Sequence, residues 1–98
     1  MSRERLDETA VAGALAGLDG WALEEDGAAI TKTFAFRTFS EAFGFMARCA
    51  LAAEKLDHHP EWSNVYGKVE VRLTTHSAGG LTALDFELAK RMDRYAGS

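Results

Sequence analysis

The chain has 98 residues, a length at which proteins form one hydrophobic core, and 47% apolar with 27% charged residues is the composition of a globular protein. We therefore expect a single domain over residues 1–98 and exclude the disordered and fibrous classes. Eleven Lys and Arg against fifteen Asp and Glu give a net charge of −4, which is the wrong sign for neutralising phosphates, so direct binding of nucleic acid is not expected.

A first helix is predicted over about residues 5–18. Apolar side chains recur there at helical spacing, among them Leu6, Val11 and Leu15, and they form one stripe that can be buried. Gly13 lies inside this segment and lowers its helix propensity.

A β-hairpin follows, with strands over residues 21–25 and 28–39. The Asp26-Gly27 pair between them readily adopts the positive φ angles of a tight turn. Pairing across this turn puts Leu23 opposite Ile30. Apolar and polar residues then alternate along the second strand, as a half-buried strand requires.

A second helix is predicted from an N-cap at Ser40 to about Asp57, with Glu41 in the first turn, where the helix dipole favours a carboxylate. Two apolar stripes run along it, one made of Phe43, Met46, Ala47 and Ala50 and the other of Phe45, Cys49, Ala52 and Leu56. A short chain has little material to cover both stripes, so we predict a homo-oligomer formed through this helix. The alternative is that the small residues Cys49 and Ala52 are tolerated at the surface.

A second hairpin is predicted with its turn at Gly67-Lys68. That turn places Trp62 opposite Leu73 and Tyr66 opposite Val69. The apolar residues of the hairpin then share one face, and the polar residues share the other. The face expected to be apolar comprises Trp62, Tyr66, Val69, Val71 and Leu73.

A third helix is predicted after an N-cap at Thr82. Asp85 stands at the third helical position, a spacing typical of a helix cap. We therefore interpret Asp85 as a cap residue rather than as a general base. Leu81 and Phe86 can form the accompanying hydrophobic staple. The order helix, hairpin, helix, hairpin, helix predicts an α+β fold, a four-stranded antiparallel sheet with three helices on one face.

Cys49 is the single cysteine, so the chain can form neither an internal disulfide nor a metal site built from cysteines, and a cytoplasmic location is expected. Residues 1–8 are not followed by the apolar core of a signal peptide. No apolar run of spanning length occurs, so association with a membrane is not expected. Cys49 lies within an apolar helix, which favours packing over nucleophilic chemistry.

The three histidines of the chain, His58, His59 and His76, stand at the ends of predicted elements. Pro60 pushes the preceding residue out of helical geometry, so we expect His59 to leave the second helix while His58 stays in its last turn. His76 follows a predicted strand, where a loop begins and a concave site can form. The ends of the helix and the strand are therefore the predicted place for chemistry.

Each histidine also has a purely structural interpretation, either as a partner of a helix dipole or as a solvated strand end. A zinc site is disfavoured, because adjacent His58 and His59 cannot reach one metal as i, i+4 neighbours do and no HExxH pattern is present. Glu54 lies one turn before His58 and is either a support for its charged form or a solvated carboxylate. The sequence leaves both roles of Glu54 open.

A composite pattern joins these residues: Glu54, His58-His59-Pro60, Tyr66, His76 and Asp85. In this pattern and in its order of elements, the chain resembles the pterin-4a-carbinolamine dehydratase family over essentially its whole length. The resemblance implies a hydro-lyase that removes water from a 4a-hydroxytetrahydropterin to give the quinonoid dihydropterin. That reaction recycles tetrahydrobiopterin for aromatic amino acid hydroxylases and implies no metal ion and no cofactor. The resemblance also implies a homodimer or homotetramer with the second helix at a subunit interface.

By the same resemblance, His58, His59 and His76 line the pterin site. His58 and His76 are the acid and base candidates, because an imidazole with a pKa near ~6.5 gives or takes a proton at neutral pH, and His59 mainly positions the substrate. The further residues expected to bind substrate are Glu54, Asp57, Trp62, Thr74, Thr75 and Ser77. The alternative is a non-catalytic dimerisation or coactivator module, or a pterin-binding protein, on the same scaffold.

Overall fold

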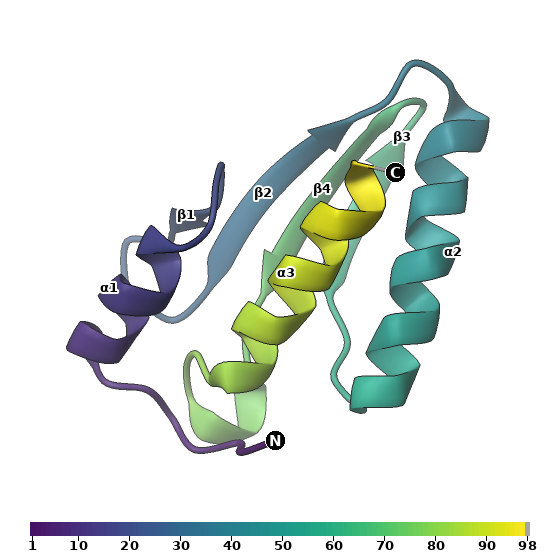
Figure 1. The fold of residues 1–98 in the computed structure, drawn as a ribbon. Helices are drawn as coiled ribbons and strands as arrows, with labels where there is room; N and C mark the ends of the chain where they lie inside the picture. The colour runs from purple at the N-terminus through teal and green to yellow at the C-terminus, as the bar shows by residue number, and fades with distance from the viewer. Residues whose placement is uncertain (98) are drawn as a thin grey trace.

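The computed structural model describes residues 1–97, and its elements follow the predicted order (Figure 1). The helices are α1 (Glu8–Ala16), α2 (Phe39–Leu56) and α3 (Ala83–Ala96), and a short 3-10 helix, η1 (His76–Ala78), precedes α3. The strands are β1 (Ala22–Leu23), β2 (Ile30–Ala35), β3 (Glu61–Val65) and β4 (Lys68–Leu73). They form one antiparallel sheet in the order β1-β2-β4-β3. The predicted α+β fold is confirmed.

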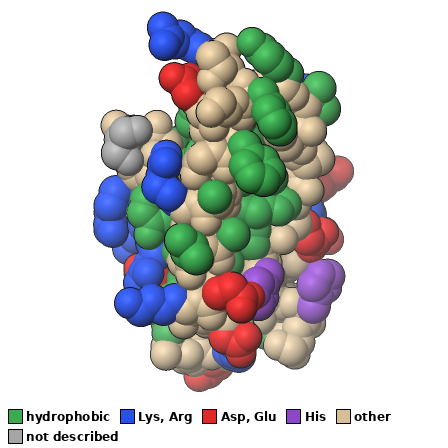
Figure 2. Space-filling model, turned by 90° about the vertical axis from the view of Figure 1, so that its right-hand side faces the viewer, with side chains coloured by type: hydrophobic (Ala, Val, Ile, Leu, Met, Phe, Trp, Pro, Cys, Tyr) green, Lys and Arg blue, Asp and Glu red, His purple; other side chains and the backbone are tan. Residues whose placement is uncertain are grey.

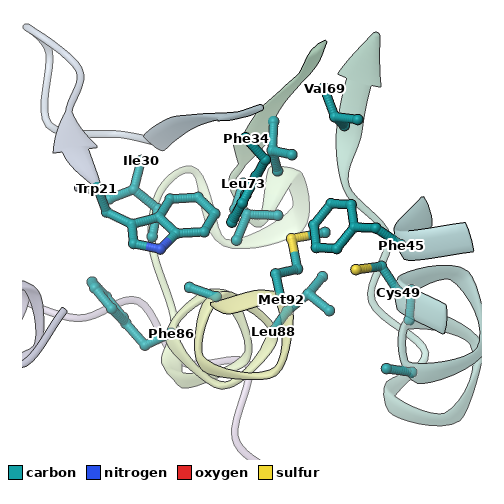
Figure 3. Packing of buried hydrophobic residues seen from close by; sticks show 14 of the residues in the cluster. Trp21, Ile30, Phe34, Phe45, Cys49, Val69, Leu73, Phe86, Leu88 and Met92 are labelled. Atoms are coloured by element: carbon teal, nitrogen blue, oxygen red, sulfur yellow. The ribbon is translucent and has the colours of Figure 1, made fainter. Parts of the chain in front are cut away.

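The core lies between the sheet and the helices, with α3 running across β4 and α2 beside it (Figure 1). Figure 3 shows Phe45 of α2 and Met92 of α3 pointing toward Phe34 and Leu73 of the sheet. The rings of Phe34 and Phe45 lie 4.8 Å apart between centroids. No helix among residues 1–97 combines the length and the apolar character needed to cross a membrane.

The first helix begins later than predicted, at Glu8 rather than near residue 5. Asp7 is its N-cap, since its side chain accepts a hydrogen bond from the Ala10 amide at 2.8 Å. The residues before Asp7 are held by another part of the chain. The Leu6 amide donates to the Leu81 carbonyl at 2.9 Å.

The second helix also begins at a different cap. Thr38, not Ser40, is the N-cap, because its hydroxyl accepts from the Glu41 amide at 3.1 Å and its backbone is extended. The placement of Glu41 in the first turn is confirmed. β2 accordingly ends at Ala35, before the predicted limit at residue 39.

The first hairpin has the predicted register, with Leu23 opposite Ile30. The second does not: Trp62 pairs with Val71 rather than Leu73, and the turn lies at Tyr66-Gly67. A shift of two residues keeps every β4 side chain on its predicted face. It does move Tyr66 out of the predicted apolar face, into a turn where its side chain is exposed.

Gly67 explains where this turn forms. The Phe36 amide donates to the Gly67 carbonyl at 2.7 Å, so the turn is tied to the end of β2. A Cβ atom on Gly67 would overlap the carbonyl oxygen of Phe36. The residue without a side chain therefore occupies the point of closest approach.

The two apolar stripes of α2 differ in burial. Phe45, Cys49 and Ala52 are buried in the chain's own core, so the interpretation of Cys49 and Ala52 as tolerated surface residues is wrong. In the other stripe Phe43 is 58% exposed. Leu51, on the same helix, is 74% exposed. The outer side of α2 is therefore apolar and uncovered within this chain.

The third helix has the predicted capping box. The Thr82 hydroxyl accepts from the first turn, and the Asp85 side chain accepts from the Thr82 amide at 2.9 Å. Leu81 and Phe86, the predicted staple residues, are both buried in the core. The predicted apolar stripe of this helix comprises Leu84, Leu88 and Met92, which are buried, and Tyr95, which is partly buried.

Candidate functional site

The end of α2 sets the directions of the first two histidines. Asp57 adopts the left-handed conformation (φ 52°), its amide donates to the Glu54 carbonyl, and the His58 amide donates to the Ala53 carbonyl at 3.0 Å. These bonds form a Schellman motif, which ends the helix at Leu56, two residues before His58. The expectation that His58 stays in the last helical turn is therefore wrong, because the chain reverses at Asp57.

His58 forms a buried pair with Asp85 of α3. The distance from His58 Nε2 to Asp85 Oδ1 is 2.6 Å, and the side chains are 6% and 0% exposed. The second carboxylate oxygen, Oδ2, accepts from the Thr82 amide and from the Thr75 hydroxyl at 2.8 Å. Asp85 is thus the predicted cap and, in addition, the partner of a histidine, a contact that the sequence analysis missed.

The second pair lies at the surface. His59 Nε2 is 2.6 Å from Glu54 Oε1, and both side chains are exposed. The option in which Glu54 supports His58 is wrong, because the left-handed Asp57 turns His58 toward Asp85 instead. The histidine that Glu54 contacts is His59.

The third pair joins η1 to the start of β3. His76 Nε2 is 3.1 Å from Glu61 Oε2, and the same oxygen accepts from Arg72 Nη1 at 2.9 Å. Arg72 also holds Glu24 by two hydrogen bonds of 2.8 and 2.9 Å. The hydrogen bond from Arg72 lowers the pKa of Glu24, and the bond to Glu24 raises the pKa of Arg72.

Neither Glu61 nor Arg72 was singled out from the sequence. Glu61 faces Arg72 across the strands in the observed register, where opposite charges attract. In the predicted register Glu61 faces Thr74, so the signal was hidden by the misplaced turn. A correct assignment of the turn at Tyr66-Gly67 would have revealed this charged pair.

The other residues expected to bind substrate differ in whether their side chains already have partners within the fold. The Thr74 hydroxyl donates to the Ala28 carbonyl at 2.6 Å, and Thr75 is held by Asp85, so both hydroxyls have partners inside the fold. Ser77 is exposed on η1, and Trp62 is partly buried against the core. The Asp57 side chain is exposed, while its carbonyl accepts from Arg3 at 2.6 Å.

The three histidine pairs arise from adjoining stretches of chain. Glu61, the partner of His76, comes two residues after His59, while Thr75, a partner of Asp85, precedes His76. Figure 2 shows histidine side chains beside acidic ones, at one end of a hydrophobic surface that covers α2. The arrangement offers imidazoles, each next to a carboxylate, for proton transfer. Among residues 1–97 no group of three or more His, Cys, Asp and Glu is placed to hold a metal ion.

Comparison with known proteins gives a consistent result. The family model described as pterin 4 alpha carbinolamine dehydratase matches residues 4–95. A relative from Mesorhizobium japonicum, named as a candidate pterin-4-alpha-carbinolamine dehydratase, is 61% identical over 97 residues, which cover 99% of each chain. A relative from Sinorhizobium fredii with the same name is 62% identical over 96 residues, covering 98% of this chain and 91% of its own.

A solved structure from Brucella melitensis, titled a transcriptional coactivator/pterin dehydratase, is 53% identical and superimposes with a TM-score of 0.93. The match covers 96% of this chain and 100% of that one. The residues matched by the family model, 4–95, span the segment that carries the three histidines. With the family model spanning both ends of the fold, the chain belongs to the pterin-4-alpha-carbinolamine dehydratase family.

Proposed function

We propose that the chain is a hydro-lyase that removes water from a 4a-hydroxytetrahydropterin and releases the quinonoid dihydropterin, in the recycling of tetrahydropterin in the cytoplasm. Membership of the family supports the substrate class. The observation that carries the proposal is that each of the three histidines lies within 3.1 Å of a carboxylate oxygen. Carboxylates in this position orient an imidazole and stabilise its protonated form.

The reaction requires two proton movements. The bond between C4a and its hydroxyl oxygen breaks, and a proton delivered to that oxygen lets it leave as water. The proton on N5 is removed, and the electron pair of the N5–H bond forms the C4a=N5 double bond. One imidazolium and one neutral imidazole supply both steps, and the enzyme returns to its starting charge when the two exchange a proton through solvent.

We assign these proton transfers to His58 and His76. The Nε2 atom of His58 faces Asp85, which leaves Nδ1 as the ring nitrogen for substrate. His76 is exposed and receives Glu61 as its carboxylate. General acid–base catalysis of this kind accelerates a reaction by about 10² to 10⁴, which corresponds to roughly 3 to 5 kcal/mol of barrier.

His59 has a positioning role in this proposal, held by Glu54 at the rim of the site. The hydroxyls of Thr74 and Thr75 are already bound within the fold, and the Thr75 amide and carbonyl are paired with Gly80. We therefore assign pterin binding at this point to the backbone of Thr74, with Thr75 holding the local fold. Ser77 and Asp57 have exposed side chains that can hydrogen-bond a polar heterocycle. Trp62 supplies an apolar wall while remaining packed on the core.

The test follows the decay of 4a-hydroxytetrahydropterin, generated by a hydroxylase, by its absorbance. Wild-type protein should accelerate the decay, and His58→Ala and His76→Ala should each lose about 10² or more of the acceleration. Glu87→Gln, which changes a surface ion pair on α3, is the matched control and should keep full activity. Equal decay rates with and without wild-type protein would exclude the proposed dehydratase activity.

We also propose that the chain forms a homodimer or homotetramer through the outer side of α2. Phe39 and Phe43 are 50% and 58% exposed, their ring centroids lie 5.8 Å apart, and Leu51 extends the apolar surface along the helix (Figure 2). Exposed apolar surface of this kind is typical of subunit interfaces. Light scattering should give a multiple of 10.7 kDa, and Phe43→Glu should shift the protein to a monomer. A wild-type protein that stays at 10.7 kDa at micromolar concentration would contradict the proposal.

The second candidate is a module that binds partners without turnover. The Brucella melitensis structure carries both coactivator and dehydratase in its title, and the exposed outer side of α2 is a surface that such a module could use. The two candidates differ in the decay assay. A non-catalytic module would bind pterin or a partner and leave the decay rate unchanged in wild type and in His76→Ala alike.

A further inference from the structure

A line of alternating charges crosses the sheet and ends at a histidine. Glu24, just after β1, binds Arg72 of β4, Arg72 binds Glu61 of β3, and Glu61 contacts His76 of η1. Every link is between 2.8 and 3.1 Å. The line therefore connects the segment after β1 with β4, β3 and η1, and its longest step in sequence joins Glu24 to Arg72, 48 positions apart.

We propose that Arg72 is a positioning residue for His76, acting through Glu61. The inference rests on the proposed function only for its effect on turnover. Its structural content is that Arg72 fixes the Glu61 carboxylate and limits the negative charge that this carboxylate presents to the imidazole. Arg72 itself has no contact with the histidine ring, so it acts through the shared oxygen Oε2 of Glu61.

The geometry of the guanidinium supports this role. Nε and Nη2 bind the two oxygens of Glu24, while Nη1 is directed at Glu61. A planar guanidinium held at two positions has little freedom at the third, so the Glu61 carboxylate is also fixed. A lysine could supply the charge but not this fork, because its ammonium is a single point charge.

The electrostatic effect has one sign. Arg72 is a cation close to the site where an imidazolium forms, and it also shares the Glu61 oxygen that would stabilise that imidazolium. Both effects oppose a positive charge on the His76 ring, so we expect loss of Arg72 to favour the protonated ring. The groups that face His76 along this line are Glu61 in contact, Arg72 behind it, and Glu24 beyond.

The first measurement is the NMR titration of the His76 ring, which needs no substrate. In Arg72→Met the titration midpoint should rise by about half a pH unit or less, since the His76 side chain is 83% exposed and solvent screens the interaction. In Arg72→Lys the midpoint should stay near the wild-type value. Arg91→Met is the control, since it removes another partly exposed arginine from a carboxylate pair, in α3, and should not move the midpoint.

The second measurement separates positioning from folding. With dehydration as the assay, Arg72→Met should lower kcat about 3- to 10-fold with little change in KM, and Arg72→Lys should lower it too, because the fork is lost although the charge remains. A structural role alone would change the thermal midpoint and leave the His76 titration untouched.

The two proposals fail in different ways. An unmoved His76 midpoint in Arg72→Met, with Glu61→Gln lowering it, would overturn the role of Arg72 whatever the activity. A wild-type protein without dehydratase activity but with the shifted midpoint in Arg72→Met would overturn the proposed function and leave the Arg72–Glu61–His76 coupling standing. An unchanged kcat in Arg72→Met would overturn its contribution to turnover.

Discussion

His58 and Asp85 are 27 positions apart in the chain and meet in the core at 2.6 Å. Because the same carboxylate caps α3, the start of this helix and the first site histidine are held by one side chain. A change at Asp85 therefore affects both the cap of α3 and the position of His58.

Asp85→Asn should destabilise the protein by about 1 to 3 kcal/mol, since a buried hydrogen-bonded charge is replaced by an amide of equal size. Denaturant unfolding measures this loss. Glu87→Gln, at a partly exposed position of the same helix, should stay within about 0.5 kcal/mol of wild type. Equal stabilities for Asp85→Asn and wild type would show that the buried pair contributes nothing to folding.

Gly67→Ala should destabilise the protein by about 2 kcal/mol or more, because the new methyl group meets the backbone oxygen of Phe36, which cannot move without disturbing β2. Thermal unfolding measures the change. The matched control is Gly13→Ala, at an exposed position in α1 where nothing lies near the added carbon. That change should stabilise the protein by about 0.5 to 1 kcal/mol, and the idea fails if both variants shift in the same direction.

Cys49 should resist thiol reagents in the folded protein. Burial in the core raises the pKa of its thiol to about 12, so almost no thiolate exists at pH 8. Ellman's reagent should react slowly without denaturant and rapidly after unfolding in guanidinium chloride. Reaction of the folded protein at the rate of a free cysteine would contradict the burial. Cys49→Glu would therefore disrupt the core of this chain.

The ion pair between Glu24 and Arg72 should make stability depend on pH in a defined direction. Arg72 lowers the pKa of Glu24 in the folded protein below its ordinary value of 4.5, so the pair stabilises the fold above that pH. The contribution is lost as the pH falls through the lower, folded value. Unfolding curves of wild type and Glu24→Gln, collected from pH 7 to pH 3, should differ most at pH 7 and converge in acid. A difference that grows toward acid would have the wrong sign.

The fold could be predicted from the sequence because its local signals agree. Asp26-Gly27 fixed the first hairpin, and Thr82 with Asp85 fixed the start of α3. The turn of the second hairpin was predicted one residue too late. Tyr66, at φ 51°, occupies a left-handed conformation that sequence rules assign to glycine or asparagine. Its turn is set by the contact of Gly67 with Phe36, which is far away in sequence.

The sequence singled out three histidines but did not predict which carboxylates they contact. His58, His59 and His76 stood out from their positions beside Pro60 and after β4. Which carboxylates they contact depends on two backbone features that the local sequence does not predict. The left-handed Asp57 sends His58 to Asp85 and His59 to Glu54, and the register of β3 sets Glu61 beside Arg72.

The bond from Arg3 to the carbonyl of Asp57 has a practical consequence for handling the protein. Arg3 is hydrogen-bonded to the turn that precedes His58 and His59, and Leu6 is hydrogen-bonded to the loop before α3. An affinity tag fused ahead of Met1 would lie near the turn that precedes His58 and His59 and, if rich in histidine, would place additional imidazoles there. Kinetic work should therefore use untagged protein or a tag that is cleaved off before the assay.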